Sequence, residues 1–396
     1  MKHIAPLIII IMTTIFSAQA QNKQINKAVE GNNEFCFDLM ETGYEPGENM
    51  VFSPFSISTA LAMTYDGAAC RTKLNMAKTM HFPLSQQKNH ESWTQMLDYF
   101  KQLKTPVFQL ANAVWAQENF YFTNEFMEGL KDFDAMVKYV DFRNTVKREE
   151  ARRRINQWVE AKTERKIRQL ILKNNVNDLT RMILVNAIYF NADWQTQFDP
   201  AKTRKNDFHT PDGKIETDFM TMESDIMHIE KENFSAIQLP YRDELASMYI
   251  LLPAKGKKTE DIVKWLNNDR FNSLSDDFRE TTIMLALPRF KVEERYEMKN
   301  TLKKMGMVAP FSHNADFSNM NGKKILVIDD VIHQAVVVVD EEGTEAAAAT
   351  AVVIREKTAK RPLEFIVDKP FIFFIKEHKQ GNILFAGIVN NPEKTK

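Results

Sequence analysis

The sequence is poor in the residue that marks disulfide-bonded and thiol-dependent proteins. It has two cysteines, Cys36 and Cys70, among 396 residues, so no disulfide framework can hold its fold. One bridge formed in an oxidising compartment and two buried free thiols are both compatible with this count. Neither cysteine has a histidine at a fixed spacing, so neither is predicted to be a catalytic nucleophile.

The familiar motifs of enzymes are also missing. The sequence contains no G-x-S-x-G, G-x-x-x-x-G-K-[ST], G-x-G-x-x-G, H-E-x-x-H or C-x-x-C. His228 and Glu230 form an H-x-E pair, but the paired cysteines of a zinc deaminase do not accompany it. The eight histidines are scattered singly and give no metal-ligand spacing. We therefore expect no enzyme, no metal site and no cofactor. A carboxylate hydrolase without a recognisable motif is the remaining enzymatic alternative.

Neither sign of charge is in excess. The 52 lysines and arginines nearly balance the 53 aspartates and glutamates, for a net charge of −1, which argues against a nucleic acid or another polyanion as the default partner. The helix predicted over Arg148–Leu172 has a strongly basic outer face. Because Glu149, Glu150, Glu160 and Glu164 are interleaved with its cations, a solvated face is favoured over nucleic-acid or glycan binding.

Long apolar runs are confined to the start of the chain. A basic beginning, an apolar run from Leu7 to Phe16 and the ending Ala18-Gln19-Ala20 are typical of a signal peptide that is cleaved after Ala20. That run is too short to span a bilayer, and no later run is long enough. We expect a soluble protein with no membrane span, secreted or exported to a periplasmic or extracellular location.

Helical and strand patterns alternate along the rest of the chain. A helix is predicted to begin at Pro54, with Ser53 as its cap, and to continue to Gly67. Residue spacing predicts further elements as follows: helices over Ile25–Met40, Trp93–Leu103, Arg148–Leu172 and Glu297–Met305, and strands over Leu110–Gln117, Met182–Phe190, Ile237–Leu239, Met248–Leu252, Ile283–Phe290, Gln334–Val339, from about Leu363, Pro370–Ile375 and Ile383–Val389.

The segment Asp340–Ile354 (DEEGTEAAAATAVVI) fits neither a turn nor a core element. It follows an apolar strand, and the next strand is not predicted until about Leu363, which is typical of a functional loop. With the period of a strand, one face carries only small or apolar uncharged residues. No proline occurs between Glu341 and Lys360, so the segment could pair on both sides within a sheet. An alanine-rich helix or a plain exposed loop is the alternative.

This segment resembles the hinge and reactive-centre loop of the serpins, the serine protease inhibitor superfamily. The matching hinge residues are Glu341, Glu342, Gly343, Thr344, Glu345, Ala346, Ala347, Ala348 and Ala349. The resemblance extends over nearly all of the chain after the signal peptide, including Asn49–Ile57, Asn156–Val159 and Phe385–Pro392. Cys70 stands where the family usually has glycine, which leaves the local turn geometry open.

The resemblance implies an α+β fold of mixed sheets. It predicts three β-sheets, about eight or nine helices and an exposed reactive-centre loop at about residues 341–362. The serpin domain would be a single unit over residues 21–396 and a monomer.

It also implies a reactive bond. Counting along the loop as in the family places that bond at Lys357-Thr358, and lysine before the bond suits a trypsin-like protease. The protein would form a covalent 1:1 complex with its target. Arg355 and Val353 mark alternative cleavage sites, so that elastase-like, subtilisin-like or cysteine proteases are alternative targets. Glu356 would deter some trypsin-like enzymes.

The implied mechanism is insertion of the cleaved loop as a new strand of the main sheet. Residues that match the region where the sheet opens are Ser53, Ser56, Asn186 and His333. Residues that match the point where the loop enters are Trp194, Thr203 and Arg289, and Arg289 is predicted to pair with Glu341. A non-inhibitory serpin, acting as a chaperone or a small-molecule carrier, is the functional alternative. It is disfavoured because the inward hinge positions are small and uncharged.

Overall fold

A computed structural model describes residues 25–103, 108–242, 244–344 and 361–394. The predicted signal peptide, hinge residues 345–349 and the candidate cleavage positions Val353, Arg355, Lys357 and Thr358 lie outside these residues. The helices are 25–43, α2 (Pro54–Asp66), α3 (Cys70–Met80), α4 (Gln86–Gln102), α5 (Asn124–Asp132), α6 (Thr145–Lys162), α7 (Thr259–Trp265), α8 (Asn268–Ser273), α9 (Lys299–Lys304) and α10 (Ser318–Asn321).

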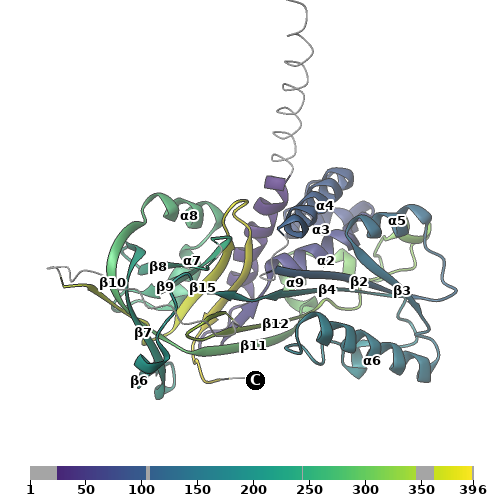
Figure 1. Ribbon diagram of the computed structural model, residues 1–396. Coiled ribbons are helices and arrows are strands. Elements are labelled where there is room, and N and C mark those ends of the chain that lie inside the picture. Colours follow the sequence, from purple (N-terminus) through teal and green to yellow (C-terminus); the bar gives the residue numbers. More distant parts are fainter. Residues whose placement is uncertain (1–24, 104–107, 243, 345–360, 395–396) are drawn as a thin grey trace, which may run out of the picture.

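The described strands form one large and three smaller hydrogen-bonded groups (Figure 1). They are β1 (Met50–Phe52), β2 (Phe108–Gln117), β3 (Ala135–Val140), β4 (Met182–Phe190), β5 (Ala192–Asp193), β6 (Arg204–Thr210), β7 (Gly213–Glu230), β8 (Phe234–Pro240), β9 (Ala246–Pro253), β10 (Arg279–Pro288), β11 (Phe290–Glu297), β12 (Ile332–Val339), β13 (Gly343–Thr344), β14 (Leu363–Ile366), β15 (Phe371–Glu377) and β16 (Ile383–Val389). The expected mixed α+β class is confirmed.

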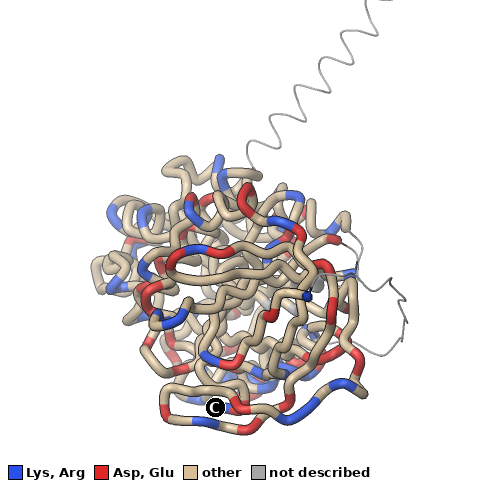
Figure 2. The backbone as a smooth tube through the Cα atoms, turned by 90° about the vertical axis from the view of Figure 1, so that its left-hand side faces the viewer, with Lys and Arg blue, Asp and Glu red and all other residues tan. Residues whose placement is uncertain are grey.

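The large group holds the main core. Its strand order is β1-β16-β15-β9-β8-β7-β10-β14, with β6 on β7, and the pairing is antiparallel except between β10 and β14. All seven residues of β16 and six of the seven in β15 are buried. Such continuous aromatic and β-branched runs form strands because both faces are covered by apolar side chains. At the end of the molecule that carries β7 and β10, cationic and anionic residues are interspersed (Figure 2).

The groups β3-β2-β4 and β11-β12 form a second layer between helices (Figure 1). On one face α6 contributes Ala151, Ile155 and Val159 to a small apolar cluster that also includes Val185 of β4. On the other face lie α2, α4 and α5. Two of the candidate functional residues, Asn186 of β4 and His333 of β12, belong to this second layer.

Helix α2 begins and ends as the sequence predicts. The Ser53 side chain accepts a hydrogen bond from the Ser56 amide, Pro54 occupies the first helical position, and Gly67 is the C-cap. Eleven of its 13 residues are buried. The helix is therefore a central support for the sheet rather than a surface element.

The helix predicted over Arg148–Leu172 is wrong in its second half, because α6 ends at Lys162. Glu164 and Arg165 adopt positive φ angles of 45° and 66°, which turn the chain back. The Asn156 side chain then exchanges two hydrogen bonds with the backbone of Ile171, each 2.9 Å. Residues 163–176 are here called the strap. This reversal of the chain, and not a continued helix, buries Ile167, Leu170, Ile171 and Val176.

The two cysteines do not pair. Both are free; Cys36 is buried but Cys70 is exposed, so the alternative of two buried thiols is wrong for Cys70. Cys70 has a φ of 48°, a conformation that favours glycine. The turn thus keeps the glycine-like geometry although the side chain differs.

No helix in the described part of the chain is long and apolar enough to cross a membrane. Over the same residues, no group of three or more histidine, cysteine, aspartate or glutamate side chains is arranged to hold a metal ion.

Gly387 in β16 offers a test of the core. A Cβ atom there would lie 2.4 Å from Phe373 Cε1 and 2.7 Å from the backbone oxygen of Met50. Gly387→Ala is therefore expected to lower the free energy of unfolding by about 1–3 kcal/mol through overpacking, measured by urea unfolding followed by circular dichroism. Gly43→Ala is the control, because its nearest neighbour would be Met50 Cε at 3.4 Å. Equal stability of the two variants would contradict the packing described here.

Candidate functional site

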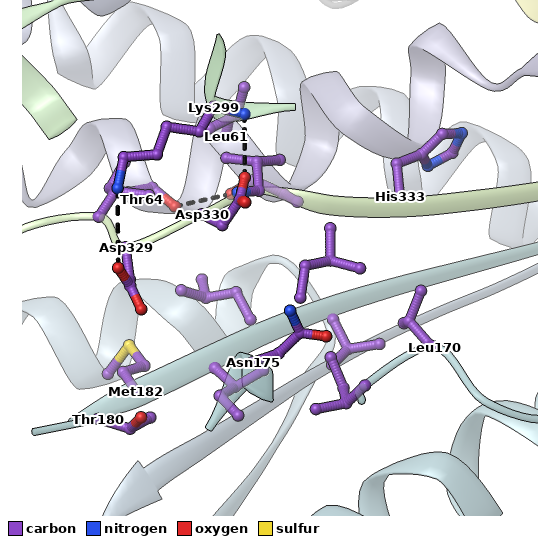
Figure 3. A pocket seen from close by; sticks show the side chains of 18 of the residues that line it. Leu61, Thr64, Leu170, Asn175, Thr180, Met182, Lys299, Asp329, Asp330 and His333 are labelled. Atoms are coloured by element: carbon purple, nitrogen blue, oxygen red, sulfur yellow. Dashed lines mark hydrogen bonds and ion pairs between the residues drawn. The ribbon is translucent and has the colours of Figure 1, made fainter. Parts of the chain in front are cut away.

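A slot separates β4 from β12. Over the described residues β4 pairs with β2, β12 pairs with β11, and no strand pairing joins β4 to β12. Between them lies a cavity of about 610 Å³, lined by both strands, by α2, by the strap and by residues 325–331. Figure 3 shows side chains from these segments that line it, among them Leu61, Leu170, Met182 and His333.

The end of the slot beside β5, here called its upper end, contains the first two residues of a strand that follows β12 in the chain. After β12 the chain turns at Asp340, whose carboxylate accepts hydrogen bonds from the amides of Glu342 (3.0 Å) and Gly343 (3.3 Å). The next residues form β13, which pairs antiparallel with β5. Of the predicted hinge, Gly343 and Thr344 are therefore already in a sheet.

Gly343 is required by close backbone contact. A Cβ atom at this position would lie 2.1 Å from the Ala192 carbonyl oxygen and 2.7 Å from Asp193 Cα. Because these are backbone atoms, they cannot move aside as a flexible side chain would. A larger residue would push β13 away from β5.

Glu341 is held by two of the residues predicted at the insertion point. The Arg289 guanidinium donates to both of its carboxylate oxygens at 2.6–2.9 Å, and the Thr203 hydroxyl also donates to it. Glu341 is 4% exposed. Burial would raise its pKa, but the hydrogen bonds from Arg289 and Thr203 outweigh burial, so the pKa is lowered and the carboxylate stays charged. The predicted ion pair is present.

Trp194 holds the backbone of the same turn. Its indole N–H donates to the Asp340 carbonyl at 3.0 Å, and its backbone amide donates to the Glu342 carbonyl at 2.8 Å. Its ring stacks on Tyr241 with centroids 4.7 Å apart, and the Tyr241 hydroxyl lies 2.7 Å from that of Thr344. Sequence reasoning missed Tyr241 and Asp340. Asp340 could have been recognised from the sequence, because aspartate commonly forms turns by bonding to nearby backbone, and Asp340 lies four residues before Thr344.

The predicted opening cluster joins β12, the start of α2 and β4. The Ser53 amide donates to His333 Nε2 at 3.0 Å, the Ser53 hydroxyl accepts from the Ser56 amide at 3.1 Å, and the Ser56 hydroxyl donates to the Asn186 carbonyl at 3.5 Å. Burial lowers the pKa of His333 to about 3, so the ring is neutral. The four residues thus form a chain of neutral hydrogen bonds across the slot.

Asn112 of β2 extends this cluster and was not predicted. Its side-chain oxygen accepts from the Asn186 amide at 2.6 Å, and its own amide donates to the Phe133 carbonyl at 2.7 Å. The two asparagines are register partners in the β2–β4 ladder. Two buried acceptors beside the cavity, Asn186 Oδ1 and Gln334 Oε1, have no hydrogen-bond partner. They lie on opposite walls of the slot.

The strap closes the front of the slot and is tied on both sides. On the α6 side, Asn156 holds Ile171 as described above. On the far side, Arg295 of β11 donates to the Leu170 carbonyl at 3.1 Å and to the Asn175 side chain at 2.7 Å. A strand that filled the whole slot would have to pass beneath this segment.

Comparison with known proteins assigns a class to this arrangement. Residues 30–392 match the sequence model of the family described as Serpin (serine protease inhibitor). The chain belongs to the serpin family.

Relatives match over most of their length. The chain is 35% identical to an uncharacterized serpin-like protein of Thermococcus kodakarensis, over 95% of this chain and 87% of that one. It is 34% identical to human Serpin B3, over 93% and 100%. Among solved structures, cleaved Serpin 42Da is similar with a TM-score of 0.83 at 28% identity, over 93% and 100%. Human thyroxine-binding globulin complexed with thyroxine gives 0.82 at 28% identity, over 94% and 100%.

The ion pair at the top of the slot can be tested by substitution. Arg289→Ala leaves a buried carboxylate with only Thr203 and is expected to lower the free energy of unfolding by about 1–3 kcal/mol, less than for a fully buried pair because Arg289 is partly exposed. The double variant Arg289→Ala/Glu341→Gln should recover part of the loss. Urea unfolding measures both.

Lys214→Ala is the matched control for this test. Lys214 pairs with Asp207 at 2.6 Å, but both side chains are more than half exposed. Its loss should change stability by about 0.5 kcal/mol or less. A loss as large as that of Arg289→Ala would show that burial of Glu341 is not what makes its pair important.

Proposed function

We propose that this protein is a secreted suicide inhibitor of serine proteases, with trypsin-like enzymes as its targets. The observation that carries the proposal is the slot between β4 and β12, which no described strand fills and whose upper end already holds Gly343 and Thr344. Serpins are mostly inhibitors that bind proteases rather than enzymes, and this chain belongs to that family.

The proposed chemistry begins in the protease. Its serine oxygen attacks the carbonyl of Lys357, the bond to Thr358 breaks, and the nitrogen of Thr358 leaves as an amine, so that Lys357 remains bound to the enzyme as an ester. Residues 345–357 are then free to follow Thr344 into the slot. The trap works because the loop moves before water hydrolyses the ester.

Strand insertion supplies the driving force. A full strand would make on the order of ten ladder hydrogen bonds, each stabilising by about 1 kcal/mol, with burial of its small inward side chains in addition. Two observations on the described residues support this use of the slot: the facing edges of β4 and β12 have no strand partner, and the side-chain oxygens of Asn186 and Gln334 have no hydrogen-bond partner. The loop-exposed state persists because conversion is slow, and not because it is the most stable state.

The target follows from the residue before the bond. Lys357 places an ammonium group where a trypsin-like protease has an acidic pocket. Cleavage after Arg355 would serve the same enzymes, and cleavage after Val353 would serve elastase-like or subtilisin-like ones. Glu356 is the feature that disfavours some trypsin-like targets.

The carrier alternative draws on thyroxine-binding globulin, which shares the fold and whose structure contains thyroxine. The inward hinge positions argue for insertion instead. Thr344 is 2% exposed and fits its place in β13, and the following inward positions, Ala346 and Ala348, are small. We also infer export after cleavage at Ala20 and a single, monomeric domain over residues 21–396.

The proposal is tested by incubating the protein with a slight excess of trypsin. A band at the summed mass on a denaturing gel, together with a released peptide that begins at Thr358, is the expected result. Simple cleavage without a complex, for trypsin and then for elastase and subtilisin, would contradict the inhibitory function.

The inward hinge positions provide a sharper prediction. Thr344→Arg or Ala348→Glu would place a charge in the closed sheet at a cost of several kcal/mol, so insertion should slow and most of the protein should be cleaved as a substrate. Glu345→Lys, on the opposite face of the strand, is the control and should still form the complex. The ratio of complex to cleaved product on the gel measures the effect, and undiminished complex with Ala348→Glu would count against insertion.

The residue before the bond should set the target. Lys357→Leu is expected to lower the rate of complex formation with trypsin at least about 100-fold, because the pairing with the acidic pocket is lost, and to admit chymotrypsin. Arg355→Leu is the matched control and should leave the trypsin rate close to that of the parent protein. The reverse ranking of the two variants would move the reactive bond to Arg355.

A further inference from the structure

His90 lies between two carboxylates from two other helices. Its Nδ1 is 2.6 Å from the carboxylate of Asp66, and its Nε2 is 3.1 Å from that of Asp132. A carboxylate only accepts hydrogen bonds, so both contacts are satisfied only when both ring nitrogens carry protons. The geometry is that of an imidazolium held at both ends.

The positions of the two acids strengthen this requirement. Asp66 is the last residue of α2 and Asp132 is the last residue of α5, so each carboxylate adds to the negative end of a helix. His90 comes from the first half of α4 and is placed against both ends. A neutral histidine would leave these two carboxylates, each at the C-terminal end of a helix, without the cation that contacts both of them.

Few other groups near His90 could supply the positive charge that contacts Asp66 and Asp132. The Phe133 ring packs edge-on against His90 at 5.1 Å, and Gly129 lies against Cε1. Of the charged groups on the adjoining helices, Lys131 of α5 pairs with Glu128 at 2.6 Å. On α4, Lys88 and Glu91 are nearest in sequence, and on α2 the Tyr65 hydroxyl donates to the Pro83 carbonyl.

Helix α2 contacts both walls of the slot: the Ser53 amide bonds to His333 of β12, and the Ser56 hydroxyl bonds to the Asn186 carbonyl of β4. Helix α5 lies in the chain between β2 and β3, which form one hydrogen-bonded group with β4. His90 therefore ties α2, through Asp66, to α5 and the β4 group, through Asp132. If α2 moves with β12 when β4 and β12 part, this connection is strained.

We propose that protonated His90 is a latch that restrains opening of the slot, and that loss of its proton makes the slot easier to open. The latch regulates the strand insertion of the proposed function and rests on it in that respect. A rise in pH would thus speed insertion.

The direction of the pH effect follows from the contacts. The hydrogen bond to Asp66 raises the pKa of His90 more than burial lowers it, and Asp132 raises it further. A group whose pKa is higher in the folded state adds stability that is present in full below its ordinary pKa and is lost as pH rises through the folded value. The latch should be closed at about pH 6 and open at about pH 9.

Comparison with two other histidines distinguishes the titration of His90 from that of histidines elsewhere in the protein. His333 has a lowered pKa, so its contribution to stability is lost as pH falls below its ordinary value and does not overlap the alkaline change. His81 lies between Glu34 and Asp38, both at 2.8 Å, and its pKa is also raised. It joins α3 to the helix 25–43, neither of which lines the slot. His81 is the matched control.

The test measures insertion without a protease. A synthetic, fluorescently labelled copy of residues 344–357 is mixed with the intact protein at about pH 6 and about pH 9, and the rate of its incorporation is followed by native gel electrophoresis. The parent protein should incorporate the peptide roughly three- to tenfold faster at the higher pH. His90→Asn should be fast and nearly independent of pH, whereas His81→Asn should keep the parent's pH dependence.

Asp132→Asn is a second variant of the latch that should fold normally, because the Asp132 side chain is 65% exposed and its replacement should be tolerated. It removes one arm of the latch and should reduce the pH effect without abolishing it. A parent-like pH profile in His90→Asn, or equal changes in His90→Asn and His81→Asn, would overturn the latch. If neither the parent protein nor any variant incorporated the peptide at either pH, the proposed function would be overturned, and with it the role of the latch.

Discussion

The structure depends on a strand position that is left vacant between two hydrogen-bonded groups of strands, β3-β2-β4 and β11-β12. The facing edges of β4 and β12 carry backbone groups that would pair with each other in a closed sheet, yet no pairing joins these strands over the described residues. Unpaired polar groups away from water are unfavourable. The surrounding elements enclose the vacant position: α2 lines one side of the slot, and the strap also lines it.

The two ends of the slot are held by different kinds of interaction. At the top, a charged pair between Arg289 and Glu341 fixes the turn that leads into β13. Lower down, His333, Ser53 and Ser56 form neutral hydrogen bonds, which can exchange partners without leaving a buried charge behind. The top is thus anchored, and the lower part is able to rearrange.

Much of this could be predicted from the sequence, for reasons that are local. The cap of α2 by Ser53 and the boundaries of β4 and β16 follow from side-chain chemistry and residue spacing, and the structure has them as predicted. The pairing of Arg289 with Glu341 was predicted from resemblance and is present.

What could not be predicted depends on contacts distant in sequence. The end of α6 at Lys162 is determined by the bonds between Asn156 and Ile171, which no helical periodicity reveals, because the apolar spacing of the strap also suits a helix. Tyr241 and Asn112 belong to the site through stacking and strand register. The reactive bond itself lies outside the described residues and remains a prediction.

The turn from Asp340 to Gly343 has a kinetic consequence. Starting a new strand is the slow part of forming a hairpin, because several backbone angles must be fixed before any ladder bond compensates for the lost entropy. Here that nucleus exists in advance: the turn is closed by the Asp340 carboxylate and the first pair of residues is in register with β5. In the proposed mechanism, loop uptake would therefore be a propagation step from a preformed nucleus, one residue pair after another. Its speed would be governed by how readily the walls separate and not by a search for the correct alignment.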